Sequence, residues 1–270
     1  MDKDTYLRYF RENRDAILAA GELGLDRPVK GCPGWDVATL VGHVGVVHTF
    51  WLNWIRTRPN GPTPETGKQL LAERETLLPG FTAWRDAGFS VEARPETTAI
   101  WEFVRKTGDE LESRLRELTP EDTVWTFIPG AQTGSFISRR IAVETGVHRW
   151  DAEEAVGPEA QFDRDLARDG IDEMLETMLP RINGWGEVKS GREGQRFRFV
   201  QHDGAGRWLV TFGPELTAEV GEDEAPVDVT ITGSASDLLL FVMGRRSVDE
   251  MGVAGDRELA ARWGDLAGNF

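Results

Sequence analysis

The sequence predicts a two-domain protein in which an all-α four-helix bundle is followed by a small α+β domain. The chain of 270 residues exceeds the roughly 100–200 residues of a typical domain. Apolar residues recur at helical spacing before about residue 160, whereas segments typical of strands follow later. The stretch "VGPEAQFDRD", with Gly157 and Pro158, has the composition of a linker. We therefore expect one domain at 1–158 and the other at 159–270.

Four segments of the first domain carry the helical spacing. Their apolar positions are Tyr6, Phe10 and Ile17; Leu40, Val44, Val47, Trp51 and Ile55; Ile100, Phe103, Val104, Leu111, Leu115 and Leu118; and those within 139–155. Asp36 is the expected N-cap of the second helix, and Pro95 and Pro120 bracket the third. The Pro- and Gly-bounded stretch 59–88 is an extra connection with a short helical pattern. Four such helices form a bundle whose interior can hold a site.

The second domain mixes helices and strands. A helix is expected from about Leu166 to Leu179. The segments "RFRFV" and "RWLVTF" flank the turn "HDGAG", and "VDVTIT" follows an acidic loop, so all three are predicted to be antiparallel strands. The segment "GSASDLLLFVMG" predicts a helix capped by Ser234 or Ser236, and "GDRELAARWG" predicts a last helix capped by Asp256.

Composition excludes several classes of protein. With 46 acidic residues against 31 basic ones and a net charge of −15, the chain would repel phosphate backbones, and its basic residues do not cluster, so no nucleic-acid partner is expected. The single cysteine, Cys32, cannot form an intramolecular disulfide, which suits a reducing compartment. No apolar run resembles a signal peptide or reaches the roughly 20 residues of a membrane helix. We expect a cytoplasmic protein without a membrane partner.

Histidines mark a candidate metal site. Only four occur, His43, His48, His148 and His202. Glu144 and His148 are four residues apart and share a helix face, although such pairs more often occur as ordinary solvated neighbours on surface helices. An imidazole in the apolar helix around His43 needs a partner, and two imidazoles with one carboxylate suit a zinc ion that keeps its fourth position open. Because His43 and His48 point in different directions, one helix offers only one of them, and spacing does not decide which.

Three blocks of sequence carry a family resemblance. In this order, "CPGWDVATLVGHVGVVH", "SRRIAVETGVHRWDAE" and "PVDVTITGSASDLLLFVMGR…GDRELAARW" resemble the mycothiol-dependent maleylpyruvate isomerase family over nearly the whole chain. The resemblance implies a DinB-like four-helix metal-binding domain followed by an α+β domain similar to sterol carrier proteins. It also implies that His43, Glu144 and His148 are the zinc ligands. His48 is then left as a core residue or a neighbour of the site.

The resemblance also implies a functional arginine in the second domain. Its best match is Arg245, which we expect to be catalytic, and Arg246 is adjacent. An anionic ligand in so acidic a protein needs local positive charge, which arginine supplies through paired hydrogen bonds. The alternative is that Arg245 only forms a surface ion pair with Asp249 or Asp256.

Two further residues lie on the helix of the expected ligands. Arg149 is, with Arg245 and Arg246, a candidate contact for the cosubstrate, although helical spacing also allows it to pair with Glu153. Asp151 follows His148 by three residues and could orient its imidazole, as outer carboxylates of metal sites do.

The expected chemistry depends on a thiol. A thiol bound to zinc loses its proton and becomes a nucleophile. Cys32 lies in a turn with Pro33 and Gly34 and suits loop packing better than catalysis. The expected partners are therefore a small-molecule thiol, which the resemblance identifies as mycothiol, and a small electrophilic substrate. Three functions remain: a cis-trans isomerase that returns the thiol, an S-transferase of detoxification or natural-product biosynthesis that consumes it, and a non-catalytic metal- or thiol-binding module.

Overall fold

The computed structural model describes residues 1–157, 162–181, 191, 193–213 and 226–268. Backbone contacts divide the chain into two compact units, Met1–Ala160 and Gln161–Phe270. We call them the N-terminal and the C-terminal unit and describe each by itself. Among the described residues, no helix combines the length and the apolarity that a membrane span requires.

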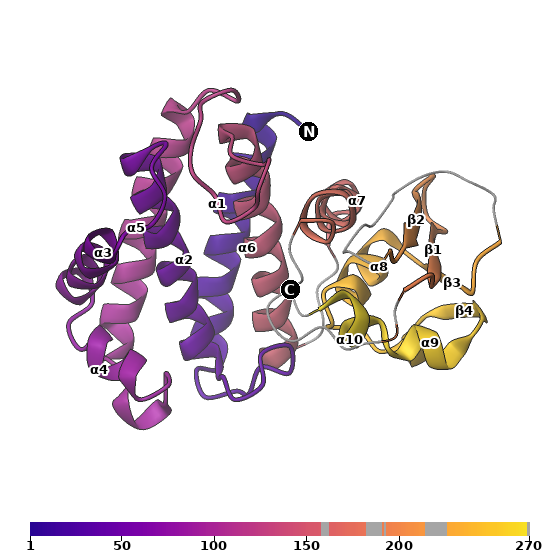
Figure 1. The fold of residues 1–270 in the computed structure, drawn as a ribbon. Coiled ribbons are helices and arrows are strands. Elements are labelled where there is room, and N and C mark those ends of the chain that lie inside the picture. The colour runs from indigo at the N-terminus through magenta and orange to yellow at the C-terminus, as the bar shows by residue number, and fades with distance from the viewer. Residues whose placement is uncertain (158–161, 182–190, 192, 214–225, 269–270) are drawn as a thin grey trace. The chain divides into compact units, whose positions relative to one another are not determined.

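Four long helices build the N-terminal unit, as the periodicity predicted. They are α1 (Lys3–Leu23), α2 (Val37–Thr57), α5 (Thr97–Glu117) and α6 (Gly134–Val156). Helix α1 packs along α6 and α2 packs along α5, so the four run side by side (Figure 1). Large aromatic side chains fill the interior, and Trp51 and Phe103 are each 1% exposed.

The helices that carry the candidate ligands begin at well-formed caps. The Asp36 carboxylate accepts a hydrogen bond from the Thr39 amide at 2.8 Å, which confirms the predicted cap of α2. A second carboxylate oxygen of Asp36 lies 2.6 Å from Arg94, so the charge of this buried cap is paired. Thr133 caps α6 in the same way, its hydroxyl accepting from the Phe136 amide at 3.2 Å. Side-chain caps of this kind fix where a helix starts.

The extra connection folds as α3 (Pro64–Leu77) and α4 (Phe81–Asp86), and η1 (Val91–Ala93) follows. Trp84 of α4 is fully buried. A Cβ atom on Gly42 would lie 2.4 Å from the Trp84 ring, so the glycine permits this close approach to α2. The connection thus packs against the bundle beside the helix that carries His43.

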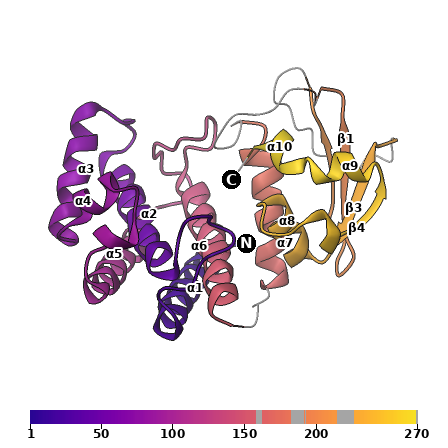
Figure 2. The ribbon, with the colours of Figure 1, turned by 90° about the horizontal axis from the view of Figure 1, so that it is seen from below.

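The C-terminal unit is an α+β fold, as expected. Its elements are α7 (Arg164–Asp172), η2 (Glu173–Met178), β1 (Arg196–Gln201), β2 (Arg207–Thr211), β3 (Val229–Gly233), α8 (Ala235–Val242), η3 (Val248–Glu250), β4 (Gly252–Gly255), α9 (Arg257–Ala261) and α10 (Trp263–Ala267). The strands form one sheet in the order β2-β1-β3-β4, and helices α7 and α8 pack against each other (Figure 2). Ser234, rather than Ser236, caps α8, and Asp256 caps α9.

The pairing of the strands corrects one prediction. Strands β1 and β2 are antiparallel, but β3 is parallel to β1, with Phe197 opposite Val229. Because chain direction reverses from β1 to β2 and again to β3, placing β3 beside β1 makes that pair parallel. The fourth strand, β4, pairs antiparallel with β3 and was not predicted. Its sequence, Gly252–Gly255, carries two glycines and no apolar alternation.

Aromatic side chains hold the sheet to the helices of the C-terminal unit. The ring of Trp263 lies 5.3 Å from that of Phe197 and 4.9 Å from that of Phe199, both in edge-to-face geometry. The Trp263 indole donates a hydrogen bond to the Val242 carbonyl at 3.2 Å, so its polar atom is satisfied in the core.

Candidate metal centre

The structure brings together His43 from α2 and Glu144 and His148 from α6. One ligand atom from each lies within 4.8 Å of the others. The two imidazole rings meet edge to face, with their centroids 5.0 Å apart. Glu144 and His148 share a face of α6 because they are four residues apart, and the packing of α2 beside α6 brings His43 to that face.

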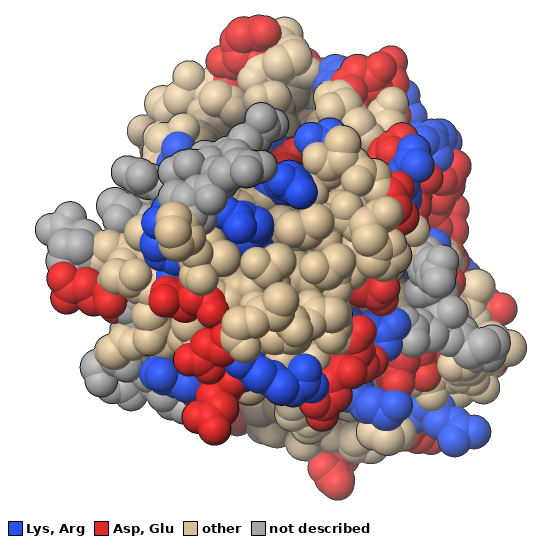
Figure 3. Space-filling view, turned by 90° about the vertical axis from the view of Figure 1, so that its right-hand side faces the viewer, with Lys and Arg blue, Asp and Glu red and all other residues tan. Residues whose placement is uncertain are grey.

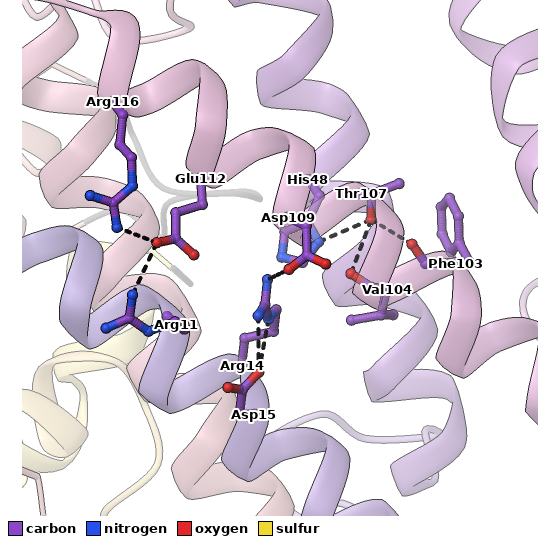
Figure 4. Close-up of polar contacts among 10 residues, drawn as sticks. All are labelled: Arg11, Arg14, Asp15, His48, Phe103, Val104, Thr107, Asp109, Glu112 and Arg116. Carbon is purple, nitrogen blue, oxygen red and sulfur yellow. Dashed lines mark hydrogen bonds and ion pairs between the residues drawn. The ribbon is translucent and has the colours of Figure 1, made fainter.

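His48, the alternative to His43, belongs to a different cluster. It is fully buried, and its ring packs edge to face on Phe10 with centroids 5.3 Å apart. The Thr107 hydroxyl donates to the Phe103 carbonyl at 2.7 Å, so its oxygen accepts from Nδ1 of His48 at 3.1 Å (Figure 4). Burial, helped by the charge of Arg14, lowers the pKa of His48 to about 3. His48 is therefore a neutral core residue at physiological pH.

Asp151 orients the imidazole of His148. The carboxylate is 1% exposed, and its Oδ2 lies 3.1 Å from Nδ1 of His148. Burial disfavours the imidazolium, but hydrogen bonds with Asp151 and with Cys32 outweigh it and raise the pKa of His148 to about 9. With Nδ1 facing Asp151, Nε2 is the nitrogen available to the His43–Glu144 side, an arrangement common among metal-binding histidines.

Arginines accompany the acidic residues of α6. Arg140, which is 4% exposed, places Nε 3.6 Å from the Glu144 carboxylate. Arg149, a predicted cosubstrate contact, places Nε 3.7 Å from Glu153, the ion pair that helical spacing allowed. Arg140 therefore pairs with a candidate metal ligand, whereas the ion pair of Arg149 is with Glu153, which is not a candidate ligand.

Trp35 lies beside the candidate ligands and was not predicted from the sequence as a neighbour of the site. Its half-buried ring lies 4.8 Å from the ring of His43. A surface pocket of about 640 Å³ is lined by Lys30, Pro33, Trp35 and Asp36, among others. The position of Trp35 directly before the cap of α2, about two helical turns ahead of His43, was the signal that could have located it.

The predicted functional arginine and its neighbour have different surroundings in the C-terminal unit. Arg246 lies 3.5 Å from Asp237 and 2.6 Å from Glu250, so its charge is used in local ion pairs. The guanidinium of half-buried Arg245 donates through Nη1 to the Met243 carbonyl at 2.8 Å.

The acidic residues considered as partners of Arg245 make other contacts. Asp249 pairs with Arg257. The carboxylate of Asp256 accepts from the Leu259 amide at 2.9 Å as the cap of α9.

The donor set of His43, Glu144 and His148 fits zinc. Two imidazole nitrogens and one carboxylate oxygen are the three protein ligands of a common class of catalytic zinc site, which leaves a fourth position for a small molecule. Calcium and magnesium prefer oxygen ligands, so two imidazoles disfavour them. His43 and Glu144 are half-buried, whereas His148 is buried.

Comparison with known proteins identifies the family. A family model described as the mycothiol maleylpyruvate isomerase N-terminal domain matches residues 7–153, and one described as the MDMPI C-terminal domain matches residues 165–262. No curated protein sequence matches the chain.

Two solved structures share the fold. A crystal structure of a mycothiol-dependent maleylpyruvate isomerase has a TM-score of 0.58 at 17% identity and covers 94% of this chain and 93% of its own. A histidine-to-alanine mutant of the same description has a TM-score of 0.59 at 15% identity, with the same coverage. Since the first family model alone spans more than half of the residues, the chain belongs to the mycothiol maleylpyruvate isomerase family.

Proposed function

We propose that this protein is a mycothiol-dependent metalloenzyme of the maleylpyruvate-isomerase type, with a zinc ion held by His43, Glu144 and His148. The observation that carries the proposal is the convergence of these three side chains, from two helices, to within 4.8 Å of one another. They are the residues to which the family resemblance assigns the metal. Membership of the family supports mycothiol as the thiol.

A zinc ion bound here would lower the pKa of a thiol at its open position and supply a thiolate near neutral pH. The protein's own residues prepare that position. Asp151 accepts the hydrogen bond of Nδ1–H and keeps the other nitrogen of His148 free of its proton when the ligand set is complete. The guanidinium of Arg140 balances the charge of Glu144, and the Trp35 ring covers one side of His43.

The substrate class follows from isomerase chemistry. A thiolate adds to the activated double bond of a cis-enedioate, the resulting single bond rotates, and elimination gives the trans product and returns the thiol. Such a substrate carries carboxylates, which a guanidinium can bind through two hydrogen bonds. We assign this contact to Arg245, on the basis of the family resemblance.

Metal analysis followed by turnover assays tests the proposal. The purified protein should contain about one zinc per chain, and incubation with mycothiol and a panel of cis-enedioates should give trans products with the thiol recovered, as measured by mass spectrometry. His43→Ala should lose both metal and turnover, whereas His202→Ala, at an exposed histidine, should keep both.

The same assay distinguishes the alternatives. Including carbon electrophiles in the panel would reveal an S-transferase, because that enzyme consumes one thiol per product. Bound zinc without any turnover would identify a binding module and contradict the enzymatic proposal. A protein that binds no zinc would overturn the metal centre itself.

A further inference from the structure

The imidazole of His148 has a second group of metal-ligating side chains at its other edge. Cys32, from the loop before α2, places Sγ 3.8 Å from Oδ2 of Asp151. Nδ1 of His148 lies 3.1 Å from the same oxygen. One ligand atom each from Cys32, His148 and Asp151 lies within 4.8 Å of the others. This cluster contains neither His43 nor Glu144.

The spacing of these atoms is close to what a tetrahedral ion requires. With metal–ligand bonds of 2.0–2.3 Å, two ligand atoms of such an ion lie roughly 3.3–3.8 Å apart. Of the observed separations from Asp151 Oδ2, the 3.8 Å to Cys32 Sγ falls at the upper end of this range, and the 3.1 Å to His148 Nδ1 is about 0.2 Å shorter than its lower end. Little side-chain movement would be needed for all three to hold one ion.

The donor types select the kind of ion. A thiolate is a soft ligand that favours zinc, cadmium and copper(I) over magnesium or calcium, and an imidazole agrees with that preference. The Asp151 carboxylate, at 1% exposure, adds the negative charge that makes a divalent ion favourable in a buried place. Half-buried Cys32 gives the cluster access to solvent.

We propose that Cys32, His148 and Asp151 form a second metal site, specific for thiophilic divalent ions, which shares the His148 imidazole with the site of the proposed function. Binding releases the proton of the Cys32 thiol and the proton on Nδ1 of His148 to solvent. Because His148 belongs to both sets of ligands, an ion bound at Cys32 lowers the affinity of the site formed by His43, Glu144 and His148 for its own metal ion. The second site therefore makes the first sensitive to thiophilic ions.

Cadmium is a suitable probe, because a cadmium–thiolate bond has an ultraviolet charge-transfer band. The sequence contains one cysteine, so any such band reports an ion on Cys32. The full-length protein is titrated with Cd²⁺ and compared with the variants His43→Ala, Asp151→Asn and Asp109→Asn. Asp109 is an exposed carboxylate of α5 and serves as the matched control.

The proposal expects the band to saturate at one Cd²⁺ per chain in the wild type, in His43→Ala and in Asp109→Asn. Asp151→Asn should raise the apparent Kd by roughly tenfold or more, as loss of a ligand or of its support does. Circular dichroism of each variant checks that the fold is retained. Loss of an equivalent of zinc from the wild type on Cd²⁺ addition would show the competition for His148.

Two results would overturn the second site. One is the absence of a band in a protein that binds zinc, and the other is a band with equal affinity in the wild type and in a folded Asp151→Asn variant, which would make Cys32 an isolated thiol. Failure of the proposed function looks different: the protein would bind no zinc at His43, while the cadmium band and its dependence on Asp151 would remain.

Discussion

Two histidines on one helix have different surroundings. His43 is half-buried beside Trp35 and lies close to Glu144 and His148. His48, five residues later, is fully buried against Phe10. Among the described residues its Nε2 has no hydrogen-bond partner, and its Nδ1 donates to Thr107. A buried imidazole of this kind stays neutral, because burial disfavours its charged form.

The low pKa of His48 predicts acid sensitivity of the fold. Its pKa is about 3 in the folded protein against an ordinary value of 6.5. Between these values the unfolded chain takes up a proton that the folded protein does not, so stability is unaffected above pH 6.5 and falls as the pH drops. The loss approaches about 1.4 kcal/mol per pH unit for one group.

Urea unfolding of the wild type and of His48→Asn measures this contribution. The asparagine amide can still donate toward Thr107 but does not titrate. The difference in unfolding free energy between the two proteins should shift by about 2 kcal/mol in favour of the variant between pH 7 and pH 5. Parallel pH profiles would contradict the neutral, buried state of His48.

At the scale of the secondary-structure elements, the close approach of two helices requires a small residue at the point of contact. Gly108 of α5 faces Arg14 of α1, and a Cβ there would lie 2.6 Å from Arg14 Cδ and 3.1 Å from His48 Cε1. Arg14 is 6% exposed, and its guanidinium pairs with Asp15 at 3.0 Å and Asp109 at 2.9 Å (Figure 4). The arginine cannot move aside without breaking these pairs, so α1 and α5 approach each other only because residue 108 lacks a side chain.

Gly108→Ala should therefore destabilise the protein by about 1–3 kcal/mol, as overpacking of a core does, even though alanine favours helix by about 1 kcal/mol. Gly67→Ala is the matched control, because Gly67 lies in helix α3 and a Cβ atom added there would meet nothing within 4 Å. That variant should be neutral or more stable by up to about 1 kcal/mol. Equal stabilisation of both proteins in denaturant unfolding would show that Arg14 yields freely.

At the scale of the whole molecule, the charge is strongly negative on average but mixed in sign from place to place. The chain carries a net charge of −15, and the face drawn in Figure 3 shows Lys and Arg side chains interspersed with Asp and Glu around an uncharged area. An anionic substrate is repelled by the average field, so its binding depends on individual arginines. In the C-terminal unit the family resemblance points to Arg245, whose neighbour Arg246 forms ion pairs with Asp237 and Glu250.

Replacement of Arg245 tests whether the C-terminal unit contributes to catalysis. Arg245→Ala should keep the metal and lower kcat/KM by about one to two orders of magnitude, because a charge-assisted contact contributes roughly 1.5–3 kcal/mol. Steady-state kinetics on the metal-replete variant measure the effect. Arg257→Ala, which breaks the exposed pair with Asp249, is the control and should leave kcat/KM unchanged. An unchanged value for Arg245→Ala would make that arginine structural.

Features that depend on neighbouring residues could be predicted from the sequence. The four bundle helices, the caps at Asp36 and Asp256, and the shared helix face of Glu144 and His148 all follow from backbone geometry over a few residues. The sequence blocks that resemble the family added a further prediction, that a four-helix domain is followed by an α+β domain. The same residue spacing gives the same local backbone geometry in any protein, so these features can be predicted without knowing which distant residues they contact.

Features that depend on packing could not be predicted in this way. That His43, and not His48, lies beside Glu144 and His148 depends on the rotation of α2 in the bundle, where the rings of Trp84 and Phe103 pack closely against Gly42 and Gly45. The parallel direction of β3 depends on its pairing with β1, and β4 is a strand only because it pairs with β3. Cys32 reaches Asp151, a residue 119 positions away, only after the loop before α2 packs against α6. Such contacts arise when side chains compete for the same interior, and that competition involves residues far apart in the chain.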